Sequence, residues 1–260
     1  MPSTTAPDGT SLFYRTDGEG PTVVFVGEAG YGAWQWAWQA PRVAGPFESV
    51  VWDLRGTGRS DAPQGPHDVE TLAGDLDAVL QAVEARRVHL VGAGLGGMVA
   101  LHYARSAGRV ASLSLFGTAA EGDAVDERSY RTLYPERTDT ESLRASLDGA
   151  LTPAFRAESD LVEQLSAWRR EEDAGPAAVD DQIAAALAFE AEPLHELAVP
   201  ALVCHGLGDP VVPVEAGKRL ATDLPRGTFE GVEGRHLCFV EHSRAVTDRL
   251  LAFLRDIESA

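Results

Sequence analysis

Short, unbroken runs of apolar residues punctuate the first 119 residues and predict strands that are buried on both faces. The stretch at 69–85 differs, because its leucines and valines recur at helical spacing and form one apolar stripe. A second helix is predicted at 98–105, directly after a glycine-rich turn. Strands that alternate with helices indicate βαβ units and a parallel sheet. The predicted strands lie at 22–26, 49–54, 88–91 and 111–116.

The pattern changes between residues 120 and 197, where no strand signal appears and acidic helical stretches dominate. Alternation resumes at 200–204 and near Phe229, and a helix at 246–257 closes the chain. Ligands of open α/β sheets bind beyond the carboxyl ends of the strands, so the helical block is expected to cover a pocket there. The predicted division is a core of 1–119 and 198–260 and a helical cap, or lid, of 120–197.

Composition narrows the class of protein. The chain has 260 residues, of which 44% are hydrophobic, and this suits one folded α/β domain. No apolar run approaches the ~18 residues that span a bilayer, and the N-terminal segment carries no secretory signal, so we expect a cytoplasmic protein without a membrane partner. Cys204 and Cys238 suit neither a disulfide framework nor a zinc site, and we expect two buried thiols.

The net charge of the chain indicates which partners and which salt conditions suit the protein. Forty acidic residues against 22 basic ones give a formal net charge of −18, which repels nucleic acid. Lys218 is the only lysine. Such a surface resembles that of proteins from salt-loving organisms, in which concentrated salt screens the repulsion between carboxylates. Arginine codon bias in a GC-rich genome is the alternative, but it explains only the scarce lysine.

A strand, a glycine-rich turn and a helix follow one another at 88–98, in the segment VHLVGAGLGGM. A phosphate-binding loop is one interpretation of this segment. However, no Lys-Ser or Lys-Thr pair follows it, and its match to the dinucleotide pattern G-x-G-x-x-G is weak. The interpretation that we favour is a sharp strand-to-helix turn of the kind that presents a nucleophile in hydrolases, here with Gly94 at its tip.

Two later loops carry an acid and a base. In VCHGLGDPVVP at 203–213 a buried strand ends in a loop that presents Asp209, and in VEGRHLCFVE at 232–241 a loop presents His236. Asp209 is expected to accept a hydrogen bond from one imidazole nitrogen of His236, which leaves the other nitrogen as a base facing the pocket. His205, beside the first loop, is expected to be a packed scaffold residue.

Together these segments resemble the α/β-hydrolase fold family, in which a Gly-x-Ser-x-Gly nucleophile elbow, an acid loop and a histidine loop follow in this order. The segment VWDLRGTGRSD at 51–61 is also similar to a stretch common in that family. The resemblance implies a mostly parallel, twisted sheet flanked by helices, with His236 and Asp209 as catalytic residues and no cofactor or metal. It places Gly94 at the nucleophile position, and a glycine has no side chain that could act as a nucleophile.

The loop at 24–34, VFVGEAGYGAW, matches the family segment that helps to form the oxyanion hole. The resemblance implies that the backbone N–H groups of Ala29 and Leu95 are the two donors. Glu28 is unexpected, because a carboxylate beside such a hole opposes the negative charge that acyl transfer develops there. It is either a second acid or base, or a residue that points away and pairs with an arginine. Since a glycine carries no backbone strain, the turn at Gly94 need not keep the geometry that a serine requires.

Aromatic side chains are the expected lining of a small and mostly apolar pocket. Packing within the cap is the alternative for those of the helical block. The expected lining residues are Tyr31, Trp34, Phe155, Trp168 and Phe189.

Three hypotheses for function follow from a site without its serine. An enzyme without a covalent intermediate would use His236 as a general base, in hydrolysis or in lyase or cofactor-free oxygenation chemistry. A binding protein would use the pocket for a small apolar ligand. An engineered glycine would trap a substrate. The presence of both Asp209 and His236 favours the first, with a small, mostly apolar ester, lactone or epoxide as substrate.

Overall fold

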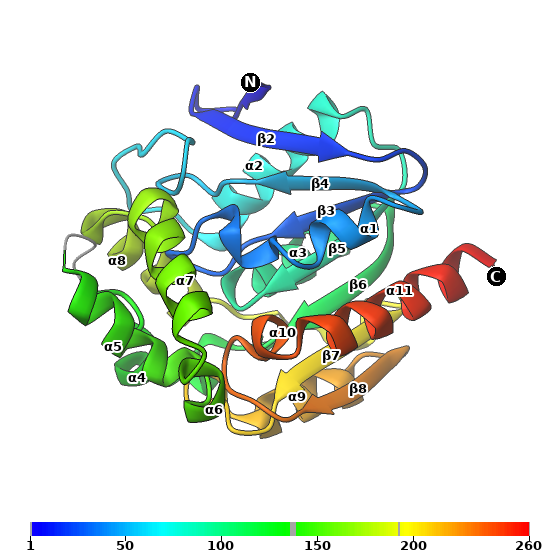
Figure 1. Cartoon of the computed structure of the whole chain (residues 1–260). Coiled ribbons are helices and arrows are strands. Elements are labelled where there is room, and N and C mark those ends of the chain that lie inside the picture. Colours follow the sequence, from blue (N-terminus) through cyan, green and yellow to red (C-terminus); the bar gives the residue numbers. More distant parts are fainter. Residues whose placement is uncertain (1, 136–138, 192, 260) are drawn as a thin grey trace.

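A computed structural model describes residues 2–135, 139–191 and 193–259 of the chain. Within these residues, eight strands form one sheet in the order β1-β2-β4-β3-β5-β6-β7-β8 (Figure 1). β1 and β2 pair in antiparallel fashion. The remaining strands, β4, β3, β5, β6, β7 and β8 in the order of the sheet, are parallel to one another. The strands are β1 (Ser3–Thr5), β2 (Ser11–Asp17), β3 (Thr22–Val26), β4 (Glu48–Trp52), β5 (Val88–Ala93), β6 (Val110–Phe116), β7 (Ala201–Gly206) and β8 (Gly227–Val232).

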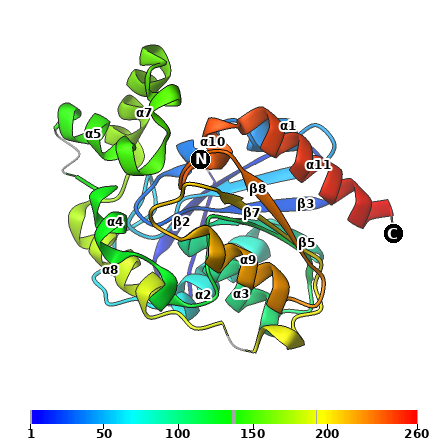
Figure 2. The ribbon, with the colours of Figure 1, turned by 90° about the horizontal axis from the view of Figure 1, so that it is seen from below.

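Helices cover both faces of the sheet. Seen from below in Figure 2, α1, α10 and α11 lie over one face, and α2, α3 and α9 lie over the other. This arrangement confirms the predicted fold class, a mostly parallel α/β sheet flanked by helices. These helices are α1 (Ala40–Val43), α2 (Val69–Ala82), α3 (Leu95–Ser106), α9 (Val214–Asp223), α10 (Cys238–Glu241) and α11 (Ser243–Ser259).

The local sequence explains these elements. Every residue of β3 is buried, as its unbroken apolar run predicts for a strand covered on both faces. Asp68 caps the N-terminus of α2, because its side chain accepts a hydrogen bond from the backbone N–H of Thr71 at 2.8 Å. Its buried stripe includes Leu72 and Leu76, which face the sheet layer.

Several element bounds differ from the predicted ones. The strand expected at 49–54 spans Glu48–Trp52, and the helix expected at 98–105 already begins at Leu95. The sequence pattern did not predict β1, β2 or α9, because their apolar residues are few and interrupted by polar ones. Cys204 and Cys238 are both buried free thiols, as expected.

The helical block between β6 and β7, which we call the cap, lies at the edge toward which the parallel strands point (Figure 1). None of the helices in the described part of the chain is long and apolar enough to cross a membrane. The cap helices are α4 (Glu127–Thr132), α5 (Thr140–Ala150), α6 (Pro153–Arg156), α7 (Ser159–Glu172) and α8 (Pro176–Leu187).

A buried ion pair ties the cap to the core. Arg169 of α7 donates from Nε to Asp173 at 2.7 Å and from Nη2 to the carbonyl of Leu133 at 2.7 Å, and it also bonds the Ser146 hydroxyl of α5 at 2.7 Å. Asp173 accepts a hydrogen bond from the indole N–H of Trp34 at 2.7 Å, in the short helix η1 (Ala33–Trp36) of the core. One guanidinium therefore holds α5 and α7 together beside the loop that follows β3.

We expect the melting temperature to rise steeply as salt goes from dilute to molar concentration. The net charge of −18 makes carboxylates repel one another, and the screening length shrinks from ~10 Å at 0.1 M salt to ~3 Å at 1 M. Differential scanning calorimetry across a salt series measures the slope. Neutralising the exposed acids Asp160, Glu163 and Glu171 together should reduce the slope of melting temperature against salt concentration. A wild-type melting temperature that does not depend on salt would leave codon bias as the explanation of the composition.

Candidate active site

The elbow between β5 and α3 keeps a tight left-handed turn. Gly94 has φ +45° and ψ −112°, so the turn keeps a backbone conformation that side-chain-bearing residues rarely adopt, although a glycine need not have kept it. A side chain would also not fit at the flanking glycines, since a Cβ on Gly92 would lie 2.4 Å from the carbonyl oxygen of Gly96, and one on Gly96 would lie 2.2 Å from that of Val26. The backbone therefore presents residue 94 at a sharp tip even though this residue has no side chain.

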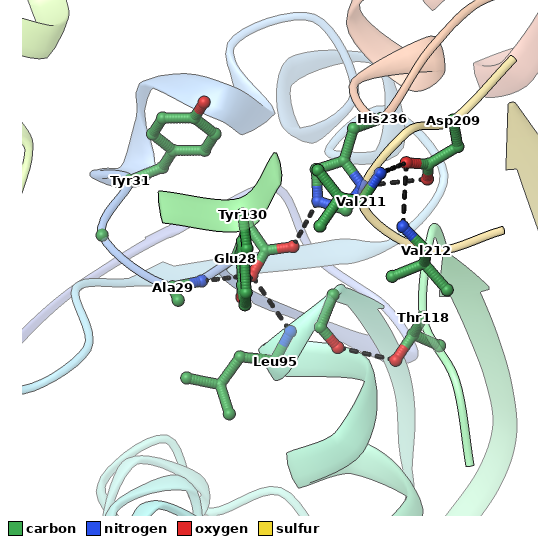
Figure 3. Close-up of polar contacts among 12 residues, drawn as sticks. Glu28, Ala29, Tyr31, Leu95, Thr118, Tyr130, Asp209, Val211, Val212 and His236 are labelled. Carbon is green, nitrogen blue, oxygen red and sulfur yellow. Dashed lines mark hydrogen bonds and ion pairs between the residues drawn. The ribbon is translucent and has the colours of Figure 1, made fainter. Parts of the chain in front are cut away.

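Asp209 and His236 meet at this tip (Figure 3). Oδ2 of Asp209 lies 2.9 Å from Nδ1 of His236. Oδ1 accepts hydrogen bonds from the backbone N–H groups of Val211 at 2.8 Å and Val212 at 3.0 Å, which fix the carboxylate. His205 is buried beside them and bonds the carbonyl of Val212 at 2.8 Å, in keeping with a scaffold role. The arrangement orients the imidazole so that its Nε2 faces the elbow.

Nε2 of His236 faces the carboxylate of Glu28 at 2.7 Å (Figure 3). The Glu28 side chain is fully buried, so the alternative that it points away and pairs with an arginine is wrong. Its Oε1 accepts hydrogen bonds from the backbone N–H groups of Ala29 at 2.5 Å and Leu95 at 3.1 Å. The two predicted oxyanion-hole donors thus converge on one oxygen, and that oxygen belongs to the protein.

Tyr130 of α4 completes the shell of Glu28, because its hydroxyl donates a hydrogen bond to Oε1. Figure 3 shows Tyr130 next to Glu28. Sequence reasoning missed this residue, since the cap carries no motif and a tyrosine in an amphipathic helix normally indicates packing. With Tyr130 in place, Glu28, His236 and Tyr130 are each no more than 2% exposed.

The loop that carries Glu28 is braced from two sides. Gln35 of η1 accepts a hydrogen bond from the backbone N–H of Glu28 at 2.9 Å and donates one to the carbonyl of Gly32 at 3.0 Å. From the cap, Gln182 of α8 accepts a hydrogen bond from the N–H of Gly30 at 2.6 Å. These amides fix the backbone on both sides of Ala29, so the carboxylate is supplied by a rigid segment.

The ionisable groups of the site shift one another's pKa values. Burial lowers the pKa of His236, but the charge of Asp209 and the hydrogen bonds to Asp209 and Glu28 outweigh burial and raise that pKa to about 10. Burial likewise raises the pKa of Asp209, while the charge of His236 and hydrogen bonds from His205 and His236 hold it well below its usual value. At neutral pH His236 is therefore an imidazolium, held between the side chains of Asp209 and Glu28.

We expect the free energy of unfolding to fall as pH rises from about 6.5 to 10. A histidine whose pKa is raised by folding stabilises the protein fully below its unfolded pKa of ~6.5 and loses that contribution as pH passes the folded value of about 10. The slope should approach ~1.4 kcal/mol per pH unit, measured by urea unfolding across the range. His236→Gln should remove it, and His195→Gln, at an exposed histidine, should not. A wild-type slope equal to that of His236→Gln would contradict the charged site.

The predicted pocket residues do not all gather at Glu28. Tyr31 is buried, with its ring 5.1 Å from that of Trp34. Trp34 and Trp168 line a hollow of about 300 Å³, together with Phe13 and Glu172. Phe189 lines a different hollow, beside Glu121 and Leu187.

Neither hollow is lined by Glu28 or His236, and Phe155 is half-buried on α6. Burial raises the pKa of Tyr31, and the electrostatic influence of Asp173 and Glu28 raises it further. Among the described residues, no cluster of His, Cys, Asp or Glu is arranged to hold a metal ion.

A sequence model of the alpha/beta hydrolase family matches residues 23–249, and the chain belongs to this family. It is 27% identical over 261 residues to 3-oxoadipate enol-lactonase 2 of Acinetobacter baylyi, covering 96% of this chain and 95% of that protein. It is 30% identical over 275 residues to a non-heme chloroperoxidase of Streptomyces lividans, covering 98% of this chain and 100% of that one. Among solved structures, an enol-lactonase from Burkholderia xenovorans superimposes with a TM-score of 0.85 at 26% identity, over 98% of this chain and 100% of that chain.

Proposed function

We propose that this chain is a hydrolase of a small, mostly apolar molecule that works without a serine nucleophile. His236, oriented by Asp209, is the general base once its proton has passed to Glu28 or to the substrate, and Glu28 is the second acid or base. The observation that carries the proposal is the buried row of Asp209, His236 and Glu28, joined at 2.9 and 2.7 Å at the tip of the elbow. Relatives named as an enol-lactonase support hydrolysis of a small substrate.

A panel of esters, lactones, epoxides and enolisable ketones tests the proposal. Turnover of at least one class should occur in the wild type and be lost in His236→Ala, because the variant has no base. Glu215→Gln is the matched control, since Glu215 is an exposed carboxylate on α9 that pairs with Lys218. Turnover that persists in His236→Ala would contradict the proposal.

A binding protein is the second candidate, and one observation favours it. Glu28 fills the hole that a substrate oxygen would occupy, and Tyr130 covers it. No turnover of any class, together with a thermal shift by a panel member, would support a binding protein. An engineered glycine is less well supported, because Glu28 occupies the space beside Gly94 and a single designed change would not have supplied it.

A further inference from the structure

A hollow of about 300 Å³ lies at the seam between the cap and the core, and it is the one that Trp34 and Trp168 line. Strands β2 and β4 and the short helix η1 form its core side, and the C-terminal end of α7 forms its cap side. η1 contacts both β4 and α7, so the two sides are held together. Pockets for small molecules begin at about this size, and the hollow is therefore large enough for a small ligand.

Asp53, which directly follows β4, is the least exposed charged group of this lining, at 4%. Its Oδ2 accepts a hydrogen bond from the backbone N–H of Arg59 at 3.0 Å, whereas its Oδ1 is buried and has no hydrogen-bond partner among the described residues. Gly58 also lines the hollow, and a Cβ on it would lie 2.7 Å from Oδ1, so glycine keeps the approach to this oxygen free of a side chain.

The unpartnered oxygen indicates the kind of group that a ligand would bring. Burial raises the pKa of Asp53, and the N–H groups of Arg59 and Ala33 and the charges of Arg59 and Arg15 oppose this rise without cancelling it. A buried acceptor without a donor costs roughly 1–3 kcal/mol. A ligand N–H group that reached Oδ1 would remove this cost, and a positively charged one would also stabilise the carboxylate.

Glu172 of α7 brings a second carboxylate to the hollow, from the cap. Its Oε2 accepts a hydrogen bond from the backbone N–H of Trp34 at 2.8 Å, and its carbonyl accepts one from the N–H of Gly58 at 2.8 Å. Burial raises the pKa of Glu172, and the charge of Asp53 raises it further. The carboxylates of core and cap therefore repel one another, and an ammonium group between them would relieve that repulsion.

The walls of the hollow are aromatic. Trp34 comes from the core and the half-buried Trp168 from the cap, and Phe13 of β2 lies on the same hollow. The guanidinium of Arg59 already lies over the Phe13 ring, 4.6 Å from its centroid. Aromatic faces attract cations and also pack against apolar carbon. The two tryptophans therefore suit an ammonium group that is carried on an apolar body.

The charges of the lining change sign between the interior and the mouth. Asp53 and Glu172 are buried or half-buried, whereas Arg15, Arg59 and Glu171 are exposed. The interior is therefore negative, and the mouth, with two guanidiniums against one carboxylate, is positive. A simple cation would meet the guanidiniums on entry, and a simple anion would meet the carboxylates inside. A ligand with its ammonium group inward and a carboxylate outward matches both ends.

We propose that this hollow binds the zwitterion of a small, apolar amino acid. Its ammonium group donates to Oδ1 of Asp53 and lies near Glu172, and its apolar part packs between Trp34 and Trp168. Its carboxylate pairs with Arg15 at the mouth. The inference goes beyond the proposed hydrolase function, because it concerns a separate site and a ligand that need not react there.

The position of the site gives the ligand a mechanical consequence. Asp53 belongs to the core, and Glu172 and Trp168 belong to the cap, so a bound zwitterion contacts both. It should therefore favour the closed cap and raise the melting temperature in proportion to its occupancy.

Isothermal titration calorimetry on the whole chain at one fixed salt concentration tests the inference. The panel is leucine and ε-aminocaproate, which carry adjacent and separated charges, with hexylamine and hexanoate as partners that each lack one charge. We expect a zwitterion to bind about threefold or more tightly than hexylamine, because a pairing at an exposed mouth is worth up to ~1 kcal/mol, and hexanoate not to bind. Hexylamine that binds as tightly as both zwitterions would overturn the inference, and so would a panel without binding.

Variants place the ligand in the hollow. Asp53→Asn should lower zwitterion affinity about tenfold or more, because a hydrogen bond to a charged group is lost. Should this buried change unfold the protein, Trp168→Leu, at a half-buried position, is the second test and should also weaken binding. Glu163→Gln, at an exposed carboxylate on the same helix α7, is the matched control and should bind as the wild type does. Affinity unchanged in Trp168→Leu and in folded Asp53→Asn would overturn the inference.

Two further variants separate a binding role from a structural one and from the elbow site. Arg15→Gln should weaken the zwitterion but not hexylamine, which a general disturbance of the hollow would not do. His236→Ala should leave zwitterion affinity unchanged whether or not the chain is a hydrolase. Loss of binding in His236→Ala would place the ligand at the elbow and overturn the inference.

Discussion

Replacement of Gly94 by serine should produce a less stable protein with no ordinary esterase activity. The new Cβ would start 1.4 Å from Oε2 of Glu28, so the carboxylate must leave its place between His236 and the two backbone donors. Breaking a buried charged pair costs about 3–5 kcal/mol, and a side chain at φ +45° adds about 1–3 kcal/mol of strain. We expect the free energy of unfolding to fall by about 3 kcal/mol or more.

The double variant Gly94→Ser with Glu28→Gly should outperform the single one. Removing the carboxylate frees the space beside residue 94, empties the hole and lets His236 face the serine hydroxyl. The measurements are urea unfolding and hydrolysis of p-nitrophenyl acetate at high salt, with His236→Ala in the same background. Gly74→Ser is a matched control, since a Cβ there meets nothing within 4 Å. A single Gly94→Ser variant that turned over at roughly 1 s⁻¹ in a His236-dependent way would show that Glu28 does not obstruct a serine.

Replacement of Arg169 by alanine should destabilise the protein by about 3–5 kcal/mol. The variant leaves Asp173 buried without its guanidinium and removes the donors that bond Leu133 and Ser146. The side chain is 1% exposed, so water cannot replace these bonds without opening the cap. Hydrogen exchange should therefore rise first in α5 and α7.

The neighbouring residue supplies the control for this experiment. Arg170 has the same side chain on the same helix but is exposed, and Arg170→Ala should change stability by no more than about 0.5 kcal/mol. The free energy comes from urea unfolding of both variants beside the wild type. Equal stability of the Arg169 and Arg170 variants would refute the role of the buried pair.

Much of the fold was predictable because the strands are buried on both faces. The run TVVFV predicted β3 to the residue, and the helical spacing of Leu72 and Leu76 predicted α2. The short α9 was not predicted. Four of its ten residues are buried, and its apolar positions do not form a continuous run. Apolar patterning thus identifies elements that bury a whole face and misses those that bury only part of one.

For the site, motif order indicated which loops approach one another, but not what fills the space between them. Asp209, His236 and the donors Ala29 and Leu95 could be read from their loops. The direction of the Glu28 side chain could not, because a carboxylate beside an oxyanion hole conflicts with the usual chemistry of that hole. Only the contact between Glu28 and Gly94 shows that the two residues fit together. Tyr130 was not predicted, because its role depends on how the cap packs against the core.

The brace from Gln182 to Gly30 has a consequence for how the site responds to ligands. The same cap that covers Glu28 through Tyr130 also holds the backbone of its loop through α8. Access to the carboxylate and the rigidity of the carboxylate are therefore thermodynamically linked, since lifting the whole cap would release both contacts at once. By reciprocity, a compound that favours the open cap must weaken the alignment of Glu28, and one that aligns Glu28 must favour closure. An inhibitor that wedges the cap open would thus disable the site without touching His236.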